Sequence, residues 1–210
     1  MQNTRTTEPR QRRRTEVPRS GVSRTTLLLW ISFVGFGWLA LMALVVLFPW
    51  NGADRMHHWG LIAVSAAVAF GTFAPVESTL YVNGLTVRGL FGTIVLTHIV
   101  VYMPVPTHSL LTLAEIPIYM LVGIALFYTI GALGMPVLYA MGKRLFSRRS
   151  RRYDVRRAWR QSTELGALVF GCVVLIGLRA FTPMLAGLWA LMVVFAEYIF
   201  LSYIEPPIER

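Results

Sequence analysis

The chain has 210 residues, of which 55% are hydrophobic and only 14% are charged, and its formal net charge is +10. Soluble globular domains carry about 25% charged residues, so the composition excludes an ordinary soluble fold and indicates a polytopic membrane protein. The single cysteine, Cys172, excludes an internal disulfide and a CxxC site. Because it lies in an apolar run, we interpret it as a small packing residue.

Residues 1–24 are polar and basic and contain two prolines, which predicts a disordered cytoplasmic tail. The apolar run that follows, residues 27–48, raises the alternative of a secretory signal. It is about 22 residues long, however, whereas the apolar core of a signal has roughly 7–15 residues. At about 1.5 Å per residue the run crosses a hydrocarbon layer of roughly 30 Å. We therefore predict a first transmembrane helix.

A second span is predicted over residues 58–75, where Ala63, Ala67 and Gly71 form a small-xxx-small ridge that lets another helix approach closely. The next segment, ESTLYVNGLTVRG, places Asn83-Gly84 between short β-prone runs. Asn-Gly is a strong turn signal for a β-hairpin. The segment therefore predicts a short β-hairpin or re-entrant stretch, with a plain loop as the alternative.

Four further spans are predicted, the first of them short and the second long. In the long span Pro117 and Pro136 indicate kinks. A basic loop over residues 143–158 separates this span from the last two. The predicted fold is an all-α transmembrane domain over residues 25–205, whose last four spans are 90–105, 110–141, 159–181 and 184–204.

The basic residues determine the predicted topology. Residues 143–160 contain nine Lys or Arg, and cytoplasmic loops of membrane proteins are enriched in these residues. If this block and the basic tail both lie in the cytoplasm, an even number of spans must separate them, and four spans satisfy this condition. Six spans then place both termini in the cytoplasm, and we expect a multi-pass protein of the plasma (inner) membrane.

The basic block also raises the question of a ligand. Apolar spans flank it and no nucleic-acid recognition fold surrounds it, so no nucleic-acid partner is expected. Basic residues beside a span attract anionic lipid headgroups, at about 1 kcal/mol each. The predicted headgroup contacts are Arg148, Arg149, Arg151, Arg152, Arg156 and Arg157.

Ionisable residues inside spans are costly and therefore candidates for function. Glu115 and Arg179 are predicted at a similar depth near the outer ends of two spans, where they form either a ligand site or a structural ion pair. His108 and His98 are further candidates for that ligand site, although a buried histidine such as His98 can equally be a hydrogen-bonded packing residue. Glu197 has Glu164, Arg160 and Arg157 as its neighbours in predicted depth. It is predicted to bind a proton or ligand, or else to snorkel or pair with the basic loop.

Metal and catalytic sites find little support. Several possible ligands lie on the outer side, but His57 and His58 are adjacent and cannot both face one ion from a regular helix. With no HExxH motif, we expect no metal and no cofactor. The chain also has no GxSxG, no P-loop and no GxGxxG that follows a strand. We therefore expect a protein that is not an enzyme.

The order of elements resembles a known class of membrane module. FAPVE ends a helix, TLYVNGLTVRG turns the chain, two spans follow, and RRAWRQSTELGAL opens the next helix. Over residues 60–180 this resembles the six-helix N-terminal membrane sensor modules of bacterial signalling proteins that carry diguanylate cyclase, HD-type phosphohydrolase or histidine kinase domains. The resemblance implies a sensor or anchor. Since no output domain follows before Arg210, this chain is expected to be an isolated module or to act through a partner.

The length and the six spans also resemble the S components of energy-coupling-factor transporters, which dock through a ridge of small residues. Here the ridge lies on the second span, whereas that family has it on the first. The expected function is a non-enzymatic membrane module that senses or binds a ligand and couples to a protein partner or forms a homo-oligomer. A component for small-solute transport and a scaffold without a ligand are the alternatives.

Overall fold

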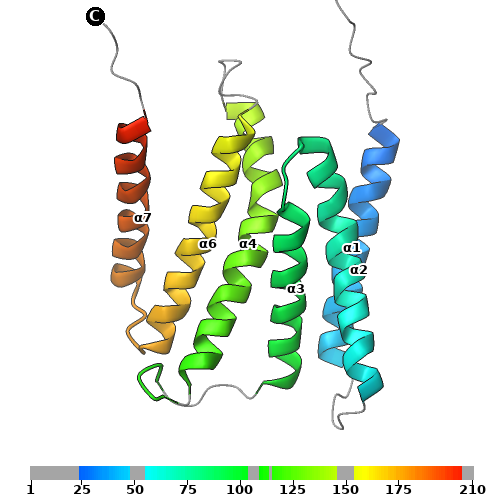
Figure 1. Ribbon diagram of the computed structural model, residues 1–210, viewed down its shortest axis with the longest axis horizontal. Helices are drawn as coiled ribbons and strands as arrows, with labels where there is room; N and C mark the ends of the chain where they lie inside the picture. Colours follow the sequence, from blue (N-terminus) through cyan, green and yellow to red (C-terminus); the bar gives the residue numbers. More distant parts are fainter. Residues whose placement is uncertain (1–23, 48–54, 104–108, 114, 146–153, 205–210) are drawn as a thin grey trace, which may run out of the picture.

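The computed structural model describes residues 24–47, 55–103, 109–113, 115–145 and 154–204. Within these residues the protein is all-helical, as predicted, and has no strand. Figure 1 shows six long helices. They are α1 (Arg24–Leu47), α2 (Arg55–Leu80), α3 (Leu85–Tyr102), α4 (Ile116–Leu145), α6 (Val155–Gly177) and α7 (Pro183–Ile204).

Successive helices run in opposite directions and lie side by side in a row (Figure 1). The row follows the order α7, α6, α4, α3 and α2, and α1 packs against α2. The helix ends along one side of this row are the start of α1, the end of α4, the start of α6 and the end of α7 (Figure 1). We call this side the basic end, because it carries Lys143, Arg144, Arg156 and Arg157. An even number of membrane crossings between the two basic blocks stays a prediction.

Five of the described helices are long and apolar enough, by length and composition, to cross a membrane. They include α3, the shortest of the predicted spans, so the protein is a multi-pass membrane protein. Helix α6 is not among the five, because its first half, up to Glu164, carries four charged side chains, whereas its second half is apolar. As α6 packs closely along α4, a sixth crossing through α6 stays a prediction.

The predicted β-hairpin is wrong. Helix α2 does not end at Pro75 but continues to Leu80, and a turn of four residues leads directly into α3. Gly84 provides the left-handed backbone of the turn, with a φ of 90°. The Glu77 carboxylate accepts hydrogen bonds from the backbone N–H groups of Gly84 (3.0 Å) and Thr86 (2.6 Å). A side chain from α2 therefore satisfies donors at the start of α3.

Pro75 is tolerated inside α2 because another helix supplies the missing hydrogen bond. A proline has no N–H, which leaves the carbonyl of Gly71 without its usual helical donor. The indole N–H of Trp30 in α1 donates to that carbonyl at 3.2 Å, and Trp38 donates to the Thr72 hydroxyl at 3.1 Å. Two tryptophans thus attach α1, most of whose residues are exposed, to α2.

The predicted small-residue ridge takes part in this contact only partly. Ala67 and Gly71 line a cavity of about 110 Å³ with Gly37 and neighbouring side chains of α1. Ala63 is exposed on α2. The ridge therefore accommodates α1 at its basic-end half, and Ala63 has no packing role among the described helices.

Replacing Trp30 with phenylalanine should loosen α1, because the Gly71 carbonyl then loses its donor while the aromatic ring is largely kept. We expect a loss of about 1 kcal/mol in the free energy of unfolding. Hydrogen exchange should be faster at the amides of residues 72–80 than in the wild type. Trp59→Phe, at an exposed position of α2, is the control. Equal exchange in both variants would contradict this role for Trp30.

The closest packing lies between α3, α4 and α6, where glycines bring the helices together. A Cβ atom at Gly92 of α3 would lie 2.6 Å from the backbone nitrogen of Thr129 in α4. A Cβ atom at Gly166 of α6 would lie 2.6 Å from the carbonyl oxygen of Phe127 in α4. Such contacts are typical of helix interfaces in membranes, where small residues allow backbones to approach closely.

Helix α4 differs from its predicted span at both ends. It begins at Ile116 instead of residue 110, so Pro117 sits in the first turn, where its missing N–H has no helical partner to lose. The predicted kink at Pro117 is therefore wrong, whereas Pro136 does lie inside the helix. Helix α4 ends at Leu145 and α6 begins at Val155. Both ends of the predicted basic loop, residues 143–158, are therefore helical.

Candidate functional site: a charged groove between helices α6 and α7

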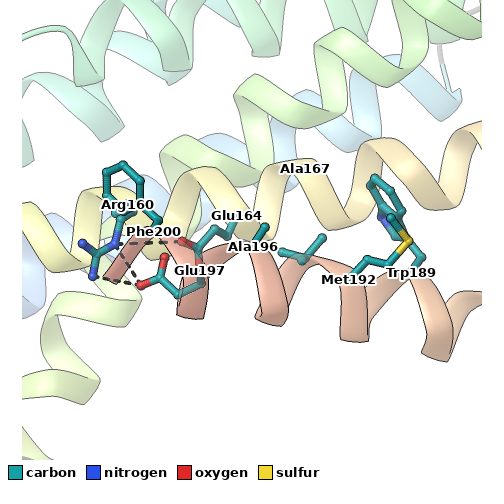
Figure 2. A pocket seen from close by; sticks show the side chains of 9 residues that line it. Arg160, Glu164, Ala167, Trp189, Met192, Ala196, Glu197 and Phe200 are labelled. Carbon is teal, nitrogen blue, oxygen red and sulfur yellow. Dashed lines mark hydrogen bonds and ion pairs between the residues drawn. The ribbon is translucent and has the colours of Figure 1, made fainter. Parts of the chain in front are cut away.

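A groove of about 440 Å³ lies between α6 and α7. Three charged side chains stand at one end of it, and Trp189 and Met192 stand at the other (Figure 2). The wall is otherwise apolar. The lining residues are Arg160, Glu164, Ala167, Trp189, Met192, Val193, Ala196, Glu197 and Phe200.

The three charged groups form one cluster. Arg160 binds Glu197 through two nitrogens, its Nε and one terminal nitrogen, which both lie 2.8 Å from the same carboxylate oxygen. The Arg160 Nε is 4.0 Å from a carboxylate oxygen of Glu164. The side chains are 29% (Arg160), 28% (Glu164) and 17% (Glu197) exposed, so a molecule in the groove could reach all three.

Helical spacing explains how the cluster forms. Arg160 and Glu164 are four residues apart and therefore lie on one face of α6. Glu197 and Phe200 are three residues apart on α7, and the Phe200 ring centroid lies 5.6 Å from the Arg160 guanidinium carbon. At the other end of the groove the Trp189 indole donates to the Leu168 carbonyl at 3.2 Å and packs on Gly171. This hydrogen bond fixes the ring as a wall of the groove.

The sequence-based prediction for Glu197 included pairing with basic residues near the basic end. The structure pairs Glu197 with Arg160, which lies in α6 just beyond the predicted basic loop. Arg157, which was also near in predicted depth, packs instead against Gly142 of α4. Arg156 is exposed in the first turn of α6. The predicted headgroup contacts Arg148, Arg149, Arg151 and Arg152 lie outside the described residues.

Glu115 and Arg179 belong to neighbouring segments at the end opposite the basic end. Glu115 immediately precedes α4, and Arg179 follows α6 with a left-handed backbone, at a φ of 56°. The backbone N–H of Leu110 donates to the Gly177 carbonyl at 2.7 Å, so the two segments touch. One carboxylate oxygen of Glu115 is buried and has no hydrogen-bond partner among the residues that the structure describes. Their common ligand site stays a prediction, and His108 lies outside the described residues.

His98 lines a different cavity, of about 400 Å³, with residues of α2, α3 and α4. Neither Glu115 nor Arg179 lines it. The ring of Tyr102 stacks on His58 with centroids 4.0 Å apart, and His98 lies 5.2 Å from Tyr102. The structure therefore separates His98 from the site predicted around Glu115. A group of three or more metal-ligating side chains does not occur in the described part of the chain.

Sequence analysis missed Arg88, whose guanidinium sits among aromatic rings from two other helices. Its central carbon lies 4.7 Å from the ring centroid of Trp159 in α6, and 5.6 Å from those of Phe127 and Tyr128 in α4. One guanidinium nitrogen donates to the Thr163 hydroxyl at 3.3 Å. The hairpin prediction placed Arg88 outside the spans. The one available signal was that Arg88 lies two residues before the predicted span 90–105, so a helix that began slightly earlier would include it.

No protein-family model matches the chain, and neither a curated protein nor a solved structure matches it.

Proposed function

We propose that this protein is a non-enzymatic membrane module that binds a ligand in the groove between α6 and α7 and couples the bound state to a protein partner. The proposal is carried by one observation, the Arg160, Glu164 and Glu197 cluster on the wall of an otherwise apolar groove. Charged groups inside a membrane-spanning helix are costly and are retained where they contact each other or a ligand.

The position of α7 supports the coupling step. No residue in the window Pro183–Phe200 is buried, and α7 packs chiefly on α6. A ligand in the groove would therefore contact both sides of the α6–α7 interface, which is much less extensive than the α4–α6 interface, and would change the preferred position of α7. Because α7 ends at the basic end, a shift would reach the same side as the start of α1, the end of α4 and the start of α6 (Figure 1).

Native mass spectrometry of the protein extracted into lipid nanodiscs tests the binding step. We expect a ligand adduct on the wild type that is lost in Ala196→Phe, because the new ring fills the middle of the groove. Ala63→Phe makes the same change at an exposed position of α2 and should keep the adduct. An adduct that survives in Ala196→Phe, or no adduct in repeated preparations of the wild type, would contradict the proposal.

Small-solute transport is a second candidate, and the buried, unpartnered oxygen of Glu115 favours it. A solute that enters from the end opposite the basic end could supply the missing hydrogen bond. Uptake into proteoliposomes should then fall in Glu115→Gln and stay unchanged in Glu197→Gln. The reverse pattern would assign the function to the groove.

A further inference from the structure

Two acidic side chains, one from α6 and one from α7, meet at the same arginine. Figure 2 shows Glu164 and Glu197 pointing toward Arg160 and toward each other. Arg160 places two nitrogens 2.8 Å from one oxygen of Glu197, whereas its Nε is 4.0 Å from the nearest Glu164 oxygen. The guanidinium charge is therefore used chiefly by Glu197. Glu164 instead forms a side-chain hydrogen bond with Glu197.

A hydrogen bond between two carboxyl groups requires a proton. An ionised carboxylate can only accept hydrogen bonds, so one member of the pair must carry an O–H group that donates to the other. Glu197 already accepts from Arg160. Ionisation of Glu164 as well would place two negative charges beside one positive charge in a groove whose wall is otherwise apolar. Glu164 is therefore the member that holds the proton and donates it to Glu197.

The groove offers no other charge that could balance a second carboxylate. The six remaining residues that line it are all apolar or aromatic. Helix α7 has no second charged residue, and its Tyr198 is exposed. The other described cations of α6 and of the helices that contact it do not line the groove; they are Arg88, Lys143, Arg144, Arg156 and Arg157.

We infer that Glu164 and Glu197 form a proton-binding site that holds α7 against α6 and releases α7 when the proton is lost to water. While the proton is bound, a carboxyl hydrogen bond and an ion pair with Arg160 join the two helices. Once the proton leaves, two carboxylates compete for one guanidinium and repel each other. The side chains of the cluster are partly exposed, which gives the proton a route to water.

Few other contacts would hold α7 in place. No residue in the window Pro183–Phe200 is buried, and the indole of Trp189, which donates to the Leu168 carbonyl, is the other printed polar contact between the two helices. When α7 moves away, Arg160 becomes free to pair with Glu164, four residues further along α6. The attached state therefore binds one proton more than the detached state, and attachment must weaken as the pH rises. This inference goes beyond the proposed function, because it requires no ligand in the groove.

Infrared difference spectroscopy tests for the proton directly, on the full chain in phosphatidylcholine nanodiscs. A protonated carboxyl group has a carbonyl stretch that an ionised carboxylate lacks. In the wild type we expect this band at about pH 6 and its loss by about pH 9.5. Glu164→Gln should lack the titrating band, because an amide N–H donates to Glu197 without a proton that titrates. Glu115→Gln, which changes a carboxyl group outside the groove, should keep the band.

Pulsed electron–electron double resonance measures the attachment of α7. Nitroxides are placed at two exposed positions toward the basic end, Arg156→Cys on α6 and Tyr198→Cys on α7, in a Cys172→Ala background. We expect one narrow distance distribution at about pH 6 and a longer, broader one at about pH 9.5, with the ratio of detached to attached α7 rising by at most about tenfold per pH unit. Glu164→Gln should keep the narrow distribution at both pH values, because glutamine mimics the protonated acid.

Three results would overturn the inference. The first is a protonated-carboxyl band that is absent from the wild type or unchanged in Glu164→Gln, since the cluster would then be an ionised structural network. The second is an α6–α7 distance in the wild type that does not respond to pH. The third is an equal pH response of that distance in Glu164→Gln, which would place the titrating group elsewhere. The native mass spectrometry of Ala196→Phe tests the ligand separately, so either idea can fail without the other.

Discussion

Gly166→Ala should lower the free energy of unfolding by about 2–3 kcal/mol, which is the range expected when a methyl group is forced into a packed interface. The new Cβ would lie 2.6 Å from the Phe127 carbonyl oxygen and 3.0 Å from its ring. The oxygen belongs to the backbone of α4 and cannot rotate away. The two helices must therefore separate, and the contacts along the α4–α6 interface weaken together.

Unfolding by sodium dodecyl sulfate in mixed micelles measures this difference. Gly60→Ala is the matched control, because a Cβ atom at Gly60 of α2 would meet nothing within 4 Å. Alanine is the better helix former, so the control should be as stable as the wild type or slightly more stable. A loss of stability that is equal in the two variants would show that the α4–α6 contact is not the cause.

Arg88→Ala should be destabilising by about 3 kcal/mol, because it removes a cation–π contact of about 1 kcal/mol to the Trp159 ring and leaves a gap between three helices. The guanidinium carbon is 4.7 Å from that ring, and weaker contacts to Phe127 and Tyr128 add to it. Arg88→Lys should recover only part of the loss. A lysine ammonium keeps the charge but cannot stack as a plane while bonding to Thr163.

A double-mutant cycle separates the aromatic contact from other effects of Arg88→Ala. Combining it with Trp159→Leu should give a coupling energy of about 1 kcal/mol in the unfolding titration. Arg156→Ala is the control, because Arg156 is exposed and lies one turn before Trp159 on α6. It should change the free energy of unfolding by less than about 0.5 kcal/mol. Strict additivity of Arg88→Ala and Trp159→Leu would show that the ring does not contribute to holding the guanidinium.

The helices of this protein were predictable because they follow from composition along the chain. Apolar runs long enough to cross a bilayer must form helices, since no water is present to satisfy the backbone. That argument found the five apolar helices, including the short α3, and the apolar second half of α6. It failed at residues 77–89, where a local Asn-Gly signal indicated a hairpin. The hydrogen bonds by which the Glu77 carboxylate caps α3 join residues only seven and nine positions apart, but they follow no helix or strand periodicity that the sequence could show.

The candidate site shows the same limit. Depth along each span placed Arg160 and Glu164 among the neighbours of Glu197, and the structure pairs Arg160 with Glu197 at 2.8 Å. Depth also suggested that Glu115 and Arg179 belong together, and the structure places them on touching segments. Rotation about each helix axis is not determined by depth. For that reason the groove and its aromatic end could not be predicted.

The sequence by itself determined that the protein is a multi-pass helical membrane protein, because hydropathy and length act locally along the chain. It also predicted that the basic residues gather at one end, which the alternating direction of the helices satisfies (Figure 1). Only the tertiary structure decided which helices touch. The position of Arg88 among three rings and the pairing of Arg160 with Glu197 depend on helix rotation and on glycine contacts, and these arise from packing between segments far apart in the sequence.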